Sequence, residues 1–247
     1  LLSRGLGDVY KRQGTVSVPS PISDFIGNGA GVAAILSSGQ VLQWGPISYQ
    51  KYPPYQVAGR GLVSAENNAP QFAKKIISTY GAFAAILPDG TATAWGDPFQ
   101  GGDPQWIRNE LQSGAKVESI VATERAFAAL KSDGTIWSWG DNNYGGGMPG
   151  GGTGYISVGA IVGDMHTNNG FASITSNNGA FAAIHRDGYV KTWGNIGYGG
   201  DSRSVADQLR SGVIKIFSTE SAFAALKSDG SVVSWGNAGG SKESVRD

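Results

Sequence analysis

Two histidines are the side chains in this sequence best suited to acid–base or metal chemistry. His166 lies in Gly-Asp-Met-His-Thr, where it could pair with Asp164. His185 occupies a position that holds Leu or Lys in related segments of the chain, which predicts an exposed place on a strand. Two histidines without any cysteine are a poor basis for a zinc site, and no nucleophile-elbow pattern accompanies them. We therefore predict no catalytic residue, no metal site and no cofactor.

Four aspartates, each followed by glycine, form a second candidate set: Asp89, Asp133, Asp187 and Asp229. Calcium loops need several oxygen ligands at fixed offsets, whereas Asp-Gly is a dipeptide favoured in tight hairpin turns. One aspartate per segment predicts a turn residue. The glycine-rich stretch at residues 145–154 lacks the Gly-Lys-Ser/Thr ending of a phosphate-binding loop and indicates a flexible linker.

The spacing around these aspartates reveals an internal repeat. Trp-Gly occurs five times, at Trp44, Trp95, Trp139, Trp193 and Trp235. A glycine stands five residues before each tryptophan, and an apolar residue followed by Ala-Ala stands twelve residues before it. Because all five tryptophans recur in register, we expect them to fill contacts between neighbouring repeats rather than to stack on a ligand.

Each repeat is predicted to hold three strands and a variable linker. A strand such as residues 127–131 leads through Asp-Gly into a returning strand at 135–139, where alternation places Trp137 and Trp139 on one face. Residues 75–79, 117–121 and 214–218 indicate a further strand upstream. The linkers suggest helices of about two turns, from Asp103-Pro104 to Gly114 and from Ser204 to Gly212, the second with a capping box of Ser204 and Asp207.

These patterns divide the chain into a tail at residues 1–13 and one repeat domain at 14–247. The tail matches nothing later in the chain and is either translated adapter sequence or an ordinary terminal segment. The repeats run over residues 14–60, 61–114, 115–155, 156–212 and 213–247, and we expect the array to be cut off at the start of a sixth unit. The fold class is mainly β, a propeller-like array of about five three-stranded units with short helical linkers, with an open β solenoid as the alternative.

The overall composition narrows the function. Nineteen Lys and Arg balance nineteen Asp and Glu, so the chain lacks the surplus of positive charge that a general nucleic-acid binder uses. No apolar run reaches the ~18 residues of a membrane-spanning helix. The absence of cysteine does not indicate a compartment.

The segment at residues 126–140, with Asp133-Gly134 five residues before Trp139-Gly140, resembles the repeat of the regulator of chromosome condensation family. The resemblance extends over about residues 29–247. It implies a β-propeller, commonly of seven four-stranded blades. Ala or Gly stands here where the family usually has His at the start of the second strand, and no Gly-Gln-Leu-Gly follows Trp-Gly. One branch of the family catalyses nucleotide exchange on a small GTPase, but the surface residues for that activity have no match in this chain.

The leading functional hypothesis is a non-catalytic scaffold that binds a protein partner within a larger protein or complex. The alternative is a lectin-like or adhesion module that binds glycan through Tyr49, Tyr52, Tyr55 and Trp106; an exchange factor or an enzyme with its site in a propeller channel ranks below both. Because insertions in repeat proteins often form the binding face, we expect function to reside in residues 49–60 and 142–169.

Overall fold

Five antiparallel sheets of three strands each make up the computed structural model, which describes residues 21–29, 31–44, 69–104, 107–147 and 170–237. Each sheet is one repeat, and its strands follow one another in chain order. The strands are β1 (Ile22–Gly27), β2 (Val32–Leu36), β3 (Val41–Trp44); β4 (Lys75–Ser78), β5 (Ala82–Ile86), β6 (Ala92–Gly96); β7 (Val117–Ala122), β8 (Ala126–Lys131), β9 (Ile136–Gly140); β10 (Phe171–Ser176), β11 (Ala180–His185), β12 (Val190–Gly194); β13 (Val213–Ser218), β14 (Ala222–Lys227), β15 (Val232–Gly236). The predicted mainly β array of five three-stranded units is confirmed.

The register within each sheet follows from the repeated spacing. Phe127 pairs with Trp139 across β8 and β9, and the equivalent residues pair in the second, fourth and fifth repeats. The two aromatic rings stack in all four cases, with centroids 5.2 to 5.4 Å apart. The glycine of Trp-Gly is required by its backbone: Gly140 has φ 111°, and a Cβ there would lie 2.6 Å from the carbonyl oxygen of Arg125.

The hydrophobic core lies between the sheets. At each of the four junctions, the forward face of one sheet packs on the rear face of the next sheet. In the third repeat the rear face carries Phe127 and Trp139, and the forward face carries Ala128 and Ile136. Each of the four core clusters combines residues of two neighbouring sheets. Most alanines of the middle strands are almost fully buried, and their small size lets the sheets approach closely.

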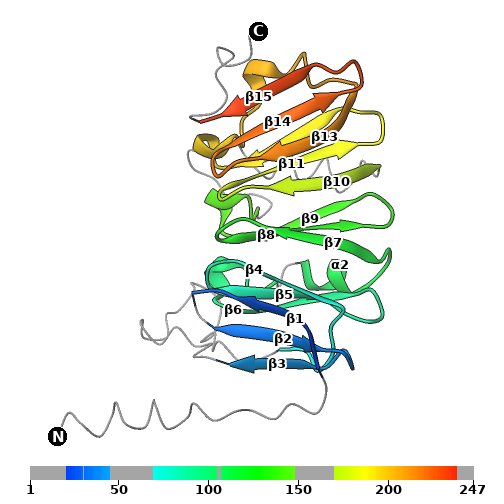
Figure 1. Cartoon of the computed structure of the whole chain (residues 1–247), viewed down its shortest axis with the longest axis vertical. Helices are drawn as coiled ribbons and strands as arrows, with labels where there is room; N and C mark the ends of the chain where they lie inside the picture. The colour runs from blue at the N-terminus through cyan, green and yellow to red at the C-terminus, as the bar shows by residue number, and fades with distance from the viewer. Residues whose placement is uncertain (1–20, 30, 45–68, 105–106, 148–169, 238–247) are drawn as a thin grey trace, which may run out of the picture.

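The sheets follow one another along the long axis of the molecule (Figure 1), with β1–β3 and β13–β15 at opposite ends. The first strands of successive sheets, β1, β4, β7, β10 and β13, contact one another along the stack. Over the described residues, therefore, the array is propeller-like but does not close into a ring. No helix in the described part is long and apolar enough to cross a membrane.

Both linkers contain short helical segments, as predicted. The helix α2 (Arg108–Gln112) lies within the range predicted from Asp103-Pro104 to Gly114, and Ile107 just before it and Leu111 within it are buried. In the other linker the capping box is wrong. Residues 203–205 form a 3-10 turn, η5 (Arg203–Val205), without a side-chain cap, and Asp207 pairs with Arg210 instead at 2.8 Å. Val205 and Leu209 are buried there, so burial of two apolar residues decides the geometry.

A short 3-10 helix follows Trp-Gly in the three middle repeats, which the sequence reasoning missed. These are η1 (Pro98–Gln100), η3 (Asn142–Tyr144) and η4 (Ile196–Tyr198). The side chain of Asp97, Asp141 or Asn195 caps the N-terminus, and a glycine with positive φ ends the helix. Gly145 is such a glycine and is buried, so the prediction of a flexible linker is wrong for the start of residues 145–154.

Several predictions lie outside the described residues. They concern the tail at 1–13, all of 49–60, most of 142–169, the side chain of Trp44, and the candidates Tyr49, Tyr52, Tyr55, Trp106 and His166. The structure does not test them.

Candidate functional site

One polar position recurs in every repeat, four residues before the apolar residue that precedes Ala-Ala in the second strand. It holds Asn28, Thr79, Thr123, Asn177 and Thr219. The position lies in the turn between the first and second strands of each sheet. In each copy the side-chain oxygen accepts a hydrogen bond from the backbone N–H three residues later, at 2.8 to 3.1 Å. This position could have been identified from the sequence, because only Thr and Asn occur there.

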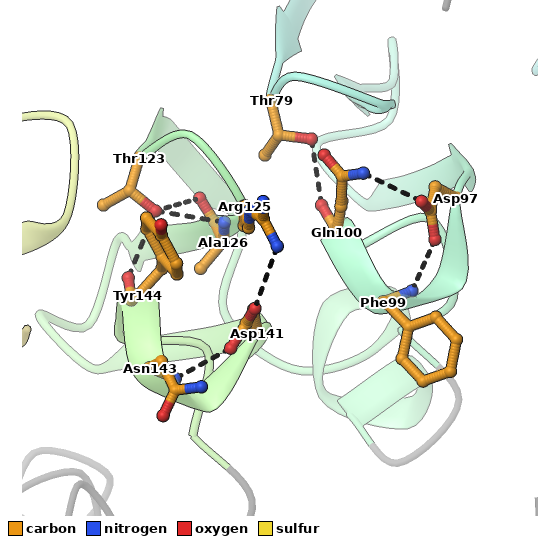
Figure 2. Close-up of polar contacts among 10 residues, drawn as sticks. All are labelled: Thr79, Asp97, Phe99, Gln100, Thr123, Arg125, Ala126, Asp141, Asn143 and Tyr144. Atoms are coloured by element: carbon orange, nitrogen blue, oxygen red, sulfur yellow. Dashed lines mark hydrogen bonds and ion pairs between the residues drawn. The ribbon is translucent and has the colours of Figure 1, made fainter. Parts of the chain in front are cut away.

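In the three middle repeats the same side chain also holds the 3-10 helix in place. Thr79 donates to the carbonyl oxygen of Gln100 at 2.9 Å, and Thr123 donates to that of Tyr144 at 3.1 Å (Figure 2). Asn177 donates to the carbonyl oxygen of Tyr198 at 2.7 Å. All three polar side chains are buried. Because both ends of each bond are fixed, the turn and the helix after Trp-Gly form one rigid corner.

The residue after this position links the repeats through their backbones. The N–H of Gly29 donates to the carbonyl oxygen of Tyr80 at 2.9 Å, that of Tyr80 to Glu124 at 2.7 Å, and that of Glu124 to Asn178 at 2.9 Å. The N–H of Asn178 donates to the carbonyl oxygen of Glu220 at 3.3 Å. We call this series the turn ladder. It runs through all five repeats and fixes the spacing of five side chains that differ from copy to copy.

An open hollow of about 380 Å³ lies over the middle of the turn ladder. Three successive repeats line it, with Ser78, Thr79 and Tyr80, then Ala122, Thr123 and Glu124, and then Ser176, Asn177 and Asn178. The buried Thr and Asn form its base. Tyr80, with 59% of its surface exposed, and Glu124 stand on its rim.

Beside the hollow, Arg125 is held at the corner of the third repeat. Its guanidinium lies 5.3 Å from the centroid of the Tyr144 ring, and its Nη1 is 3.9 Å from Oδ2 of Asp141 (Figure 2). Burial raises the pKa of the Tyr144 hydroxyl. An exposed aromatic ring, a carboxylate, an amide and a guanidinium thus occupy successive places on a rigid frame, an arrangement suited to binding.

The turn aspartates act as predicted. Oδ1 of Asp89 accepts from both the N–H and the hydroxyl of Thr91, at 2.8 and 2.6 Å, and Asp229 does the same with Ser231 at 2.9 and 2.6 Å. These side-chain and backbone hydrogen bonds hold the pKa of both carboxyls below the usual 3.8. Within the described residues, no three acidic or histidine side chains are grouped as a metal site would require.

The expectation of an exposed His185 is wrong. Only 12% of its side chain is accessible, and its ring stacks on Tyr189 with centroids 4.3 Å apart. Phe171 meets the ring edge-on at 5.4 Å. The position lies at the start of the Asp-Gly turn, where the aromatic Tyr189 of this repeat covers it. The tryptophans meet expectation: Trp95, Trp139, Trp193 and Trp235 are all buried in repeat junctions.

Comparison with known proteins identifies the repeat. The family model of the regulator of chromosome condensation (RCC1) repeat matches residues 117–145, which run from the start of β7 to the glycine that ends η3. The third repeat of this chain is similar to the RCC1 repeat. The match spans β7, β8 with its Ala-Ala, the Asp-Gly turn, β9 with its Trp-Gly, and η3. The matched unit therefore ends with the 3-10 helix at the corner of the third repeat.

Solved structures support the same fold. The complex of Kap60 with yeast RCC1 (Prp20) matches with a TM-score of 0.52, and Prp20p of Saccharomyces cerevisiae matches with 0.51, both at 16% identity over 87% of this chain. Human WBSCR16 matches with a TM-score of 0.50 at 16% identity over 90%. The matches cover 56%, 57% and 64% of those chains, so this chain spans less than two thirds of their length. No curated protein matches in sequence.

Proposed function

We propose that the chain is a non-catalytic scaffold that binds a protein partner within a larger protein or complex, and that the partner contacts the turn ladder. The observation that carries this proposal is the contrast between two adjacent positions. Thr or Asn recurs at one, hydrogen-bonded in every repeat and buried in the three middle ones, while the next varies among Gly29, Tyr80, Glu124, Asn178 and Glu220. A fixed backbone that displays a varying set of side chains is how repeat proteins build extended binding surfaces.

The chemistry of the hollow supports a protein ligand. Tyr80 offers a large, half-exposed ring with a hydroxyl, and tyrosine is enriched among residues that dominate binding energy at interfaces. Glu124 lies next to it along the turn ladder and supplies a charge that can select a basic or amide-bearing partner. Prp20p, which shares this fold, has binding properties toward Gsp1p and histones, and a protein partner is therefore a ligand class that such an array can accept.

The structural hydrogen bonds of the polar side chains support the non-catalytic part of the proposal. The turn aspartates bond to their own hairpins, and the buried Thr and Asn bond to the 3-10 corners. These groups hold the fold.

The test is a quantitative affinity capture with the wild-type chain and two variants of equal charge change. Tyr80→Ser combined with Glu124→Lys alters the rim of the hollow. The control Glu118→Lys alters an exposed residue of the same repeat on β7, away from the hollow. We expect a reproducible partner that the control retains and the rim variant loses at least tenfold. Equal capture by all three chains would contradict the proposed surface.

A further inference from the structure

The hollow over the turn ladder is formed by the three internal repeats, each of which has a further sheet stacked on both sides. Its volume of about 380 Å³ lies at the lower end of the range for ligand pockets. Apart from Ala122 and the ring of Tyr80, the lining side chains are hydroxyls, amides and one carboxylate. An apolar occupant would leave these groups without hydrogen-bond partners, so the hollow favours a polar one.

The charge in the hollow comes from Glu124, whose carboxylate is the one charged group among the lining residues. None of the ion pairs in the described part of the chain includes Glu124. Its backbone is fixed on both sides, because its N–H donates to the carbonyl oxygen of Asn178 at 2.9 Å and its carbonyl oxygen accepts from the N–H of Tyr80 at 2.7 Å. The carboxylate thus has a defined place between an aromatic ring and an amide.

The cation next to Glu124 in the chain, Arg125, interacts with other groups. Its guanidinium lies 5.3 Å from the centroid of the Tyr144 ring, and its Nη1 is 3.9 Å from Oδ2 of Asp141 (Figure 2). Arg125 does not line the hollow. The carboxylates of Glu124 and Asp141 outnumber this one guanidinium, so the corner keeps a net negative charge. The hollow is therefore complementary to a cation.

The groups around Glu124 suit a guanidinium better than an ammonium. Asn178 and Ser176 of the fourth repeat and Ser78 of the second repeat add amide and hydroxyl oxygens to the lining. A guanidinium has five N–H donors in one plane, and it can bind a carboxylate through two of them and other oxygens through the rest. Its flat face also stacks on an aromatic ring such as that of Tyr80, whereas an ammonium is a point charge without a face. An arginine side chain therefore satisfies more of the hollow than a lysine does.

We propose that the protein partner inserts an arginine side chain into the hollow, with its guanidinium paired to Glu124 and stacked against Tyr80. This inference rests on the proposed function, because it names the side chain by which a protein partner binds the turn ladder. Arginine and tyrosine are both enriched among the residues that dominate binding energy at interfaces. The pair would therefore be the main anchor of the interface, and the other variable side chains of the turn ladder would surround it.

The experiment selects peptides from a phage-displayed random library on the full 247-residue chain and measures their Kd by isothermal titration calorimetry. Glu124→Gln removes the charge but keeps the shape of an exposed side chain. Glu118→Gln is the matched control, because Glu118 is an exposed residue of β7 in the same repeat and lies outside the hollow. Each selected peptide is also synthesised with citrulline, the uncharged analogue of arginine, in place of its arginine.

We expect the peptides that the combined Tyr80→Ser and Glu124→Lys variant fails to bind to share an arginine. Citrulline should weaken binding to the wild type by about tenfold or more, and Glu124→Gln should weaken binding of the arginine peptide by a similar factor. The two changes together should cost little more than either alone, because both remove the same ion pair. The control Glu118→Gln should leave the Kd unchanged.

Two results would overturn the inference and leave the proposed function standing. One is a set of peptides that depend on the rim of the hollow but carry no arginine. The other is a loss on citrulline substitution that is as large in Glu124→Gln as in the wild type. Selected peptides that the combined rim variant binds as well as the wild type does, or a selection that yields no binding peptide, would contradict both the inference and the proposed function.

Discussion

At the residue scale, two adjacent positions in each turn have different roles: one stabilises the fold, and the next presents a variable side chain to solvent. Thr123 is buried and bonds at once to the N–H of Ala126 and the carbonyl of Tyr144, while Glu124 is exposed and contributes its backbone to the turn ladder. A buried amide that loses its acceptor costs free energy because water cannot replace it. The repeated Thr or Asn is therefore a requirement of the corner.

Replacing Thr123 with Val tests this requirement. The change keeps the shape but removes both bonds, and it should lower the free energy of unfolding by roughly 1–3 kcal/mol. Thr219→Val is the matched control, because Thr219 is exposed in the last repeat, and it should cost less. Urea denaturation of both variants measures the difference, and equal losses would contradict the role assigned to the corner.

The turn carboxylates give a pH dependence with a defined sign. Hydrogen bonds from Ser231 lower the pKa of Asp229 from 3.8, so the folded state binds a proton less readily than the unfolded chain. The stabilisation is present above the unfolded pKa and is lost as pH falls through the folded one. Asp229→Asn should therefore be less stable than the wild type at pH 7, with the gap closing below pH 3.8. A gap that is constant from neutral to strongly acidic pH would count against this assignment.

At the element scale, the Asp-Gly turn of one repeat also contacts the next repeat. Gly134 and Gly230 occupy equivalent turns with φ 83° and 85°. A Cβ on Gly134 would lie 2.4 Å from the backbone nitrogen of Gly170 in the next repeat, whereas a Cβ on Gly230 would meet nothing within 4 Å. Glycine is therefore required by the turn at both positions, and at Gly134 it is also required by the close approach of the next repeat.

Alanine at each of these glycines separates the two roles. Both variants carry the strain of a left-handed backbone, about 1–2 kcal/mol, but only Gly134→Ala also forces two repeats apart, which should add about 1–3 kcal/mol. Thermal or urea unfolding of the two variants gives the difference directly. Equal destabilisation would show that the junction yields without cost.

The sheets and the helical linkers were predictable from sequence, and the caps and corners were not, for a physical reason. Strands and hairpins recur five times, so a turn such as Asp133-Gly134 and a core residue such as Trp139 were identified by comparison within the chain. The corner of Asp141 to Gly145 was missed because a three-residue 3-10 helix has no periodicity. Ser204 and Asp207 match the residue types of a capping box, but Val205 is buried and the backbone at 203–205 forms a 3-10 turn without a side-chain cap.

At the scale of the whole molecule, stability depends on nearest neighbours. Each core cluster is shared by two adjacent sheets, as in other repeat proteins, where each unit contacts only its neighbours. The candidate hollow was not predicted, because its residues, Tyr80, Glu124 and Asn178, are far apart in sequence and differ in type. Only the stacking of three turns brings them together.

A core tryptophan tests the dependence on neighbours. Trp139 is fully buried, stacks on Phe127 and donates to the carbonyl of Gly101 in the preceding repeat at 2.9 Å. Trp139→Ala should lower the free energy of unfolding by about 3–5 kcal/mol. Trp139→Phe keeps much of the apolar surface and should lose less. If both variants lose equally, the hydrogen bond rather than the packing carries the junction.

The turn ladder is the feature on which both the fold and the proposed binding surface depend, and amide hydrogen exchange tests it most directly. The N–H groups of Tyr80 and Glu124 donate to the next repeat at 2.7 and 2.9 Å, whereas that of Glu220 has no acceptor in the described residues. In dilute monomeric protein, Tyr80 and Glu124 should exchange at least a hundredfold more slowly than Glu220, relative to their intrinsic rates. Equal, fast exchange at all three amides would show that the repeats are not held in register and would contradict the account.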